Sequence, residues 1–390
     1  MPRLYSHYLS LAALAAVGFG GGAVVHAQTP TLTTIMDGVT FRAGLGLQHD
    51  DNFFLAPSGA AVSEQINTQS VGIRLNIPVS LQRFEFDAEL TNRQHRDFEN
   101  FDYLNKNYSA AWRWSVTPQL RGNLIATRVE TLNAPSDSLN PALRNRNAAT
   151  THGFDAVYDL GGPWQLLGGY SRSSSRNEQP LIGDADEQST IYRVGTRYSL
   201  ASGNSLSYTL SQERGFNARD FTGHSHDFEG VWVVSGNTSL TGHLIYVQRD
   251  HAIAPQFDYD GVAGGVTAVW RATGKITVNA GWQRDLASYQ TAGSTHTQTD
   301  TITLAPVWQI SPITSLSAQY RYAIRRDQVN PTGLASNRRD NTQLASIVYS
   351  WQARPFVNLG ASLAHSRRTS TLSSAGYRGN LASVSAQFSF

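Results

Sequence analysis

The stretch Leu381-Ala-Ser-Val-Ser-Ala-Gln-Phe-Ser-Phe390 places Val384, Ala386 and Phe388 at every second position. A period of two residues is that of a β-strand, whose successive side chains point to opposite faces. An apolar row of this kind that ends on aromatic residues is typical of a strand with one face on lipid. We therefore predict that this stretch is the closing strand of an outer-membrane β-barrel, with Phe388 and Phe390 as its assembly signal.

The same alternation runs from residue 38 onward, in segments of about 10 to 14 residues that suit tilted membrane strands. Short connections rich in Gly, Pro, Asn and Ser, as in tight turns, lie at 80–82, 116–119, 161–163, 201–204, 235–237, 272–275, 311–313 and 353–355. Longer polar segments lie at 49–66, 96–106, 130–148, 175–188, 215–224, 250–258, 286–298, 326–341 and 366–376. The layout predicts one all-β domain, a transmembrane antiparallel up-and-down β-barrel of about 18 strands, with 16 also compatible.

The composition agrees with a membrane wall. Aromatic residues make up 10% of the chain and charged residues only 15%, which suits a surface facing lipid better than a soluble one. After residue 27 the sequence contains no run of 18 apolar residues, so a barrel is the way left to span a bilayer. With no cysteine and a net charge of +2, we expect no disulfide, no redox chemistry, no cofactor and no nucleic-acid partner.

The N-terminal residues have the features of a secretory signal. Arg3 precedes an apolar stretch of small residues, and Val25-His26-Ala27 fits a cleavage site. We predict a signal peptide over residues 1–27 and a barrel over residues 28–390, located in the outer membrane of a Gram-negative cell.

Alternation also predicts which side chains face which way. Outward rows contain Phe84 and Phe86, Tyr108 and Trp112, or Ile347 and Tyr349. An aromatic girdle near the short turns is predicted from Trp114, Trp164, Trp232, Trp270, Trp308 and Trp351. Charged residues on the opposite faces should line a polar lumen, and the candidates are Arg74, Glu85, Asp87, Glu89, Arg113, Arg121, Arg193, Arg197 and Arg321.

A short motif follows the first predicted strand, and its candidate residues are His49, Asp50, Asp51, Asn52, Phe53 and Phe54. Together with Gly46-Leu47-Gln48, it resembles the Tyr-Asp-Asp-Asn-hydrophobic-Phe signature of a β-barrel porin family. That family includes exopolysaccharide biosynthesis outer-membrane proteins of the EpsL type, associated with exosortase and PEP-CTERM systems. His49 stands where the family usually has Tyr. The resemblance implies a role in exopolysaccharide export or surface assembly.

The chemistry of the motif leaves two interpretations. Asp50, Asp51 and Asn52 could bind Ca²⁺ or sugar hydroxyl groups. Alternatively, they form an Asx-type turn that caps the strand, while Phe53 and Phe54 pack at the rim. We favour the turn and predict no metal, because a calcium shell needs about six to eight oxygen ligands and no further acidic residues stand nearby.

Arg-Asp pairs recur where strands give way to long loops. The candidate rim residues are Arg249, Asp250, Arg284, Asp285, Arg326 and Asp327. Such pairs could bind a polysaccharide beside aromatic rings, or form a solvated rim that makes cross-strand ion pairs or contacts lipopolysaccharide phosphates. His224-Ser225-His226 is placed in a loop without a hydrolase signature, and no catalytic residue is predicted.

The sequence therefore predicts a passive conduit with a polar lumen rather than an enzyme. The main hypothesis is export or surface assembly of exopolysaccharide, with the polymer, its export machinery and the barrel assembly machinery as partners. A general or substrate-specific porin for small solutes is the first alternative. A non-conducting structural or adhesive barrel is the second.

Overall fold

The computed structural model describes residues 38–390 except 58, 134–142, 180–185, 218, 289–293 and 330–337. The signal peptide predicted over residues 1–27 lies outside the described residues. The described chain forms one sheet of 18 antiparallel strands. They are β1 (Val39–Asp50), β2 (Glu64–Val79), β3 (Gln82–His95), β4 (Tyr103–Ser115), β5 (Leu120–Leu132), β6 (Arg146–Asp159), β7 (Trp164–Asn177), β8 (Glu187–Ser199), β9 (Ser205–Asn217), β10 (Asp220–Ser235), β11 (Thr238–Asp250), β12 (Tyr259–Arg271), β13 (Ile276–Ser288), β14 (Ser294–Ser311), β15 (Thr314–Val329), β16 (Arg339–Arg354), β17 (Val357–Ser370) and β18 (Tyr377–Ser389).

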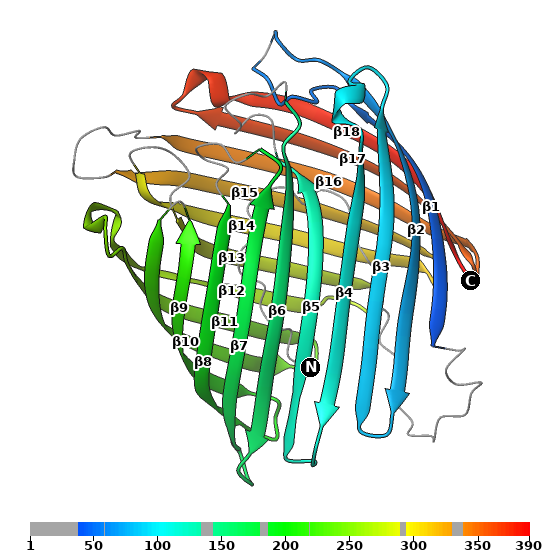
Figure 1. The fold of residues 1–390 in the computed structure, drawn as a ribbon. Coiled ribbons are helices and arrows are strands. Elements are labelled where there is room, and N and C mark those ends of the chain that lie inside the picture. The colour runs from blue at the N-terminus through cyan, green and yellow to red at the C-terminus, as the bar shows by residue number, and fades with distance from the viewer. Residues whose placement is uncertain are drawn as a thin grey trace.

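The sheet closes on itself between its first and last strands. β1 pairs with β2 on one side and with β18 on the other, where Leu45 lies opposite Ala386. Every other pair joins strands that are consecutive in the sequence, so the wall runs up and down around a central space (Figure 1). The predicted up-and-down barrel and the count of 18 strands are confirmed.

The two ends of the barrel differ. One end carries tight turns at the positions predicted for short connections, and we call it the turn end. The other, the loop end, carries the longer connections and the short 3-10 helices η1 (Glu99–Phe101), η3 (Pro255–Phe257) and η4 (Ser373–Ala375). Within the described ranges, no helix is both long and apolar enough to cross a membrane.

One predicted loop is wrong. The polar segment 215–224 continues the strands on both sides, and Phe216 pairs with Asp220 across residue 218. Polarity does not mark a strand end there, because a barrel strand can extend past the membrane into water, where both of its faces are polar. The His224-Ser225-His226 triplet consequently lies in β10 and not in a loop.

Side-chain alternation separates two walls. Large apolar side chains such as Leu45, Val194 and Leu363 are exposed on the outer wall, and the alternate positions carry polar groups on the inner wall. The tryptophans predicted for the girdle all lie close to the turn end, and the Trp114 ring stacks on Phe154 with centroids 5.8 Å apart. An apolar belt bounded by aromatic residues is the outer surface expected of a membrane-spanning barrel.

Candidate functional site in the lumen

The inner wall of β1 to β6 carries charge that is largely neutralised in pairs. Asp87 accepts hydrogen bonds from Arg42 and from Arg74, the latter at 2.8 Å. Glu85 binds Arg83 at 3.0 Å and Arg113 at 2.9 Å. Arg121 binds Asp159 at the turn end. These pairs are half-exposed to the lumen, so each contributes little to stability, but together they leave little free charge on this side.

The remaining predicted lining residues also lie at inward positions of the register. Glu89 on β3 accepts a hydrogen bond from Thr91 Oγ1 at 3.0 Å. Arg193 and Arg197 face the lumen from β8, opposite Gly169 and Gln165 of β7. Arg321 lies on β15, across from Thr303 of β14.

The opposite wall, β12 to β18, is lined mainly by hydroxyl and amide groups. β14 shows this most clearly, since its inward positions from 295 to 303 are five consecutive threonines. Ser362 and Ser383 continue the pattern on β17 and β18, with hydroxyl oxygens 2.7 Å apart. Thr295, Thr297 and Thr301 are buried, whereas Thr299 and Thr303 are half-buried and can offer uncharged donors and acceptors.

A pocket of about 260 Å³ lies within this hydroxyl-rich wall. Its polar lining comes from inward positions of β12 to β15, namely Thr267, Asn279, Gln283, Asp285, Thr301, Thr303, Gln319 and Arg321. Gln283 Nε2 donates to Asp285 at 2.6 Å, which fixes that carboxylate against the wall. Arg321 lies about midway along β15 and makes no ion pair or hydrogen bond with any residue that the structure describes.

The pocket combines the Arg321 guanidinium, unpaired among the described residues, with hydroxyl and amide groups and with the Asp285 carboxylate, which accepts a hydrogen bond from Gln283. A guanidinium binds a carboxylate through two parallel N–H donors, while Thr, Asn and Gln can donate to or accept from hydroxyl groups. The arrangement suits a small solute that carries both a carboxylate and hydroxyl groups. Within the described ranges no three His, Asp or Glu side chains lie together as a metal site.

The motif after β1 has a structural role in this molecule. Asp50 accepts a hydrogen bond from the Asn52 backbone N–H at 2.9 Å, which is the favoured Asx-type turn. Asn52 is 1% exposed, and its amide donates to the carbonyl groups of Ala56 and Arg378 at 2.8 and 2.9 Å. The turn therefore links the first loop to β18. It stabilises the seam, which is the pairing of β1 with β18 where the barrel closes.

The neighbours of Asn52 strengthen the same seam. Asp51 accepts hydrogen bonds from the backbone and side chain of Asn380, both at 2.6 Å. Burial alone would raise the pKa of the Asp51 carboxyl, but these hydrogen bonds hold it below its ordinary value. His49 lies on β1, opposite Ala382 of β18.

The two phenylalanines of the motif form an aromatic cluster at the loop end. Phe53 packs edge-on against Phe54 and Phe101, with centroids 5.0 and 5.2 Å away, and stacks on Phe98 at 5.8 Å. Ile66, at an inward position of β2, belongs to the same cluster. The first two loops therefore pack together against the inner side of the barrel mouth.

Replacing Asn52 with Ala should lower the free energy of unfolding by about 1–3 kcal/mol, because two partly buried hydrogen bonds to carbonyl groups lose their donor. Urea titration of the refolded barrel, followed by tryptophan fluorescence, measures this change. Asn237→Ala, in an exposed turn at the turn end, is the matched control and should leave the transition unchanged. An unaltered midpoint for Asn52→Ala would contradict the seam role.

The predicted rim pairs do not act as pairs, because adjacent residues of a strand point to opposite faces. Arg249 faces inward and is only 2% exposed, with Glu213 at 3.0 Å. This corrects the expectation that it stands open at the rim. Its neighbour Asp250 faces outward, opposite Thr222 of β10.

Arg284 and Arg326 face outward, and both form ion pairs with Asp300. Asp300 is not among the predicted rim residues. The two arginines lie 2.7 and 2.8 Å from its carboxylate. Asp285 instead faces the lumen and lines the Arg321 pocket. Asp327 is buried beside Arg325 at 3.1 Å.

A repeated loop was missed from the sequence, although a repeat search would have found it. The pattern His-x5-Phe-Asp-Tyr occurs at residues 95–103 and again at 251–259. In each copy Asp accepts the His backbone N–H at 2.6 Å and lies 3.2–3.3 Å from its Nδ1, around a 3-10 turn with a buried Phe. Burial lowers the pKa of His251. The two copies shape opposite stretches of the mouth.

His226 shows no catalytic arrangement among the described residues. Its Nδ1 lies 2.8 Å from the Tyr208 hydroxyl group on the neighbouring strand. Both residues occupy outward positions of the register, so the pair belongs to the outer wall and not to the lumen.

Comparison with solved structures places the barrel among known proteins by its fold. OpdK of Pseudomonas aeruginosa, solved with vanillate, has a TM-score of 0.53 and 13% identity, covering 91% of this chain and 99% of its own. OccK2 (OpdF) of the same species has a TM-score of 0.53 and 14% identity over 90% and 97% of the two chains. A BenF-like porin from Pseudomonas fluorescens Pf-5 has a TM-score of 0.52 and 13% identity over 91% and 99%.

The fold is that of outer-membrane porins. No family model and no curated protein sequence matches the chain. The resemblance of residues 46–54 to the exopolysaccharide family therefore receives no support from these comparisons. The similarity that does exist extends over nine-tenths of the chain and concerns its architecture.

Proposed function

We propose that this barrel is a substrate-selective porin of the Gram-negative outer membrane, admitting small solutes that carry a carboxylate and hydroxyl groups. The observation that carries the proposal is the luminal pocket around Arg321. In it a guanidinium without a partner among the described residues faces the channel beside Asn279, Gln319 and threonine hydroxyl groups. This replaces exopolysaccharide export as the preferred function.

The neighbouring structures support the choice of solute. OpdK was solved with vanillate and OccK2 (OpdF) in complex with glucuronate. Vanillate combines a carboxylate with one hydroxyl group, and glucuronate combines a carboxylate with several. The Arg321 pocket offers a guanidinium for the first group and amide or hydroxyl partners for the second.

The proposed mechanism is passive. A solute enters from the loop end and replaces some of its hydrogen bonds to water with hydrogen bonds to the wall of β12 to β15. It leaves at the turn end without any covalent step. The hydroxyl groups of Thr299 and Thr303 on β14 are half-buried and can form hydrogen bonds with a hydroxylated solute, in place of those that the solute loses to water. The proposal includes assembly into the outer membrane by machinery that recognises the aromatic residues of β18.

Substitution of Arg321 tests the proposal through transport selectivity. In proteoliposome swelling, Arg321→Gln should slow entry of glucuronate about tenfold relative to glucose, because one charge-assisted interaction is lost. Arg197→Gln, which removes a luminal cation outside the pocket, is the matched control and should change the ratio much less. If both variants change the ratio of glucuronate to glucose entry equally, or if neither changes it, selection at Arg321 is contradicted.

A further inference from the structure

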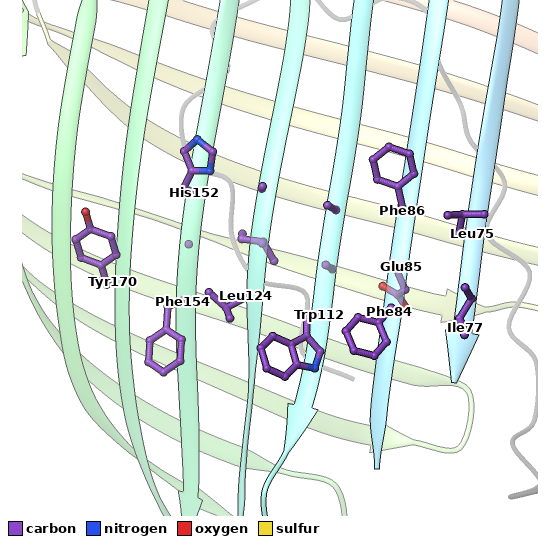
Figure 2. Close-up of a pocket in the computed structure, with 15 residues that line it drawn as sticks. Leu75, Ile77, Phe84, Glu85, Phe86, Trp112, Leu124, His152, Phe154 and Tyr170 are labelled. Carbon is purple, nitrogen blue, oxygen red and sulfur yellow. The ribbon is translucent and has the colours of Figure 1, made fainter. Parts of the chain in front are cut away.

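A groove on the outer wall is separate from the lumen. It has a volume of about 540 Å³ and crosses β2 to β7 on the face that points away from the channel. Figure 2 shows rings of Phe84, Trp112 and Phe154 along neighbouring strands, with Leu75 and Ile77 beside them. An apolar groove on a lipid-facing wall is a site for hydrocarbon chains.

Cations lie on the same strands, closer to the loop end. Arg128 is two residues beyond the groove residue Ala126 on β5, and Arg172 is two residues beyond the groove residue Tyr170 on β7. Two residues along a strand span about 7 Å and return the side chain to the same face. Both guanidinium groups therefore stand on the outer wall, where the groove ends.

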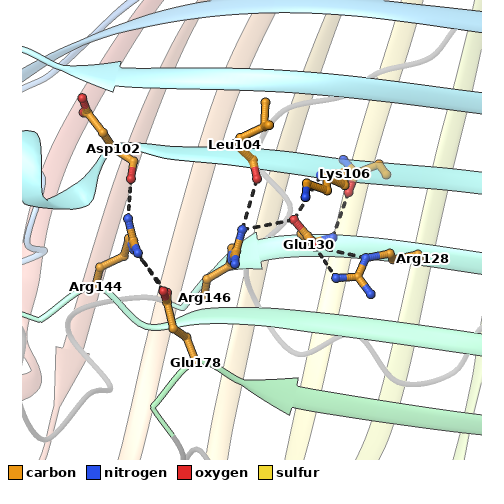
Figure 3. Close-up of polar contacts among 9 residues, drawn as sticks. Asp102, Leu104, Lys106, Arg128, Glu130, Arg144, Arg146 and Glu178 are labelled. Atoms are coloured by element: carbon orange, nitrogen blue, oxygen red, sulfur yellow. Dashed lines mark hydrogen bonds and ion pairs between the residues drawn. The ribbon is translucent and has the colours of Figure 1, made fainter.

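Further cations surround Glu130, on the loop-end side of the groove (Figure 3). Its side chain is only 2% exposed and accepts hydrogen bonds from Arg128 Nε at 3.0 Å, Arg146 at 3.4 Å and the Lys106 backbone at 3.0 Å. The Lys106 side chain and Arg172 are exposed and have no hydrogen bond or ion pair with the described residues.

The basic cluster, defined as Lys106, Arg128, Arg146 and Arg172, thus sets four cations against the single carboxylate of Glu130. Beside it, Arg144 and Glu178 neutralise each other at 2.7 Å, and Arg144 holds the pKa of the Glu178 carboxyl below its ordinary value. Asp102 adds one more carboxylate near Arg144, so the four cations still exceed the carboxylates beside them. A net positive charge is left where the apolar groove ends toward the loop end. A ligand that matches both parts has an anionic headgroup and acyl chains.

We propose that this face binds the phosphorylated glycolipid of the outer leaflet, lipid A, with its phosphates on the basic cluster and its acyl chains in the groove. The proposal rests on the outer-membrane location proposed above, with the loop end outward. Charge complementarity favours a phosphate headgroup, since each cation near a membrane surface attracts anionic lipid. The apolar groove favours a lipid over free phosphate.

Native mass spectrometry of the detergent-purified barrel with added lipid A tests this directly and is independent of transport. Lys106→Gln with Arg172→Gln removes two exposed cations that support no other described residue, and we expect at least tenfold weaker lipid A binding. Ala110→Phe, which fills the groove, should also weaken binding. The control is Arg339→Gln with Arg367→Gln, which removes two exposed outward cations on β16 and β17, away from the groove, and should retain most of the binding.

Three results would overturn the proposal. The first is lipid A binding by the Lys106/Arg172 variant equal to that of the unaltered barrel. The second is an equal loss in the control pair, which would mean general attraction to a charged wall. The third is phosphatidylglycerol binding as strongly as lipid A. A folded but silent channel that still binds lipid A would reject the proposed transport function and leave this inference standing.

Discussion

Gly122→Val should prevent assembly of the barrel, while Gly168→Val should leave it intact. A Cβ atom at Gly122 on β5 would lie 1.9 Å from the backbone oxygen of Asp155 and 2.6 Å from the Trp114 ring. Real Cβ atoms do not approach a backbone oxygen so closely, so β5 and β6 would have to separate. Forced overpacking usually costs about 1–3 kcal/mol and more where the backbone must move.

Gly168 is a matched control because it flanks the same residue. Ala156 of β6 pairs with Gly122 on one side and with Gly168 on the other, and a Cβ atom at Gly168 meets nothing within 4 Å. Heat-modifiable migration in SDS gels reports the folded fraction after refolding into detergent. Loss of the folded band in Gly122→Val alone is the expected result. Equal folding of both variants would contradict the close strand contact at Gly122.

Arg249→Met should destabilise the barrel by about 3–5 kcal/mol, because it leaves two partly buried carboxylates without their buried cation. Arg249 binds Glu213 at 3.0 Å, lies 3.8 Å above the Phe221 ring and also interacts electrostatically with Glu187. Replacement by Met keeps much of the side-chain volume, so the loss reports charge and not packing.

Urea unfolding of the refolded protein measures this effect, with Arg197→Met as the matched control. Arg197 is a luminal arginine that has no ion pair with the described residues, so its removal should shift the transition by less than about 1 kcal/mol. If the two variants unfold at the same urea concentration, the contacts of Arg249 do not stabilise the barrel.

Much of the architecture was predictable because barrel strands repeat a local rule. The Val384, Ala386 and Phe388 row and the tryptophans near the turns each follow from alternation and from the chemistry of the membrane interface. The failure at 215–224 has a physical cause. Beyond the membrane both faces of a strand meet water. The alternation of apolar and polar residues therefore ends in the sequence before the hydrogen-bonded strand ends in the structure.

The candidate site was less predictable because it depends on register between strands. Alternation identified Arg321 as inward-facing, but only cross-strand pairing brings it together with Gln283 of β13 and Thr301 of β14. The rim hypothesis failed at Arg249 for a related reason, since its partner Glu213 lies two strands away. Asp300 shows the same limit, because nothing local to it in the sequence marks Arg284 and Arg326 as its partners.

Single-channel conductance of the refolded barrel in a planar bilayer, with glucuronate or with exopolysaccharide added to one side, tests the central claim most directly. If the barrel is a porin, we expect steady conductance. Glucuronate should lower this conductance by binding at Arg321, and the polymer should leave it unchanged. Conductance blocked by polymer but indifferent to glucuronate, or a silent bilayer containing folded protein, would contradict it.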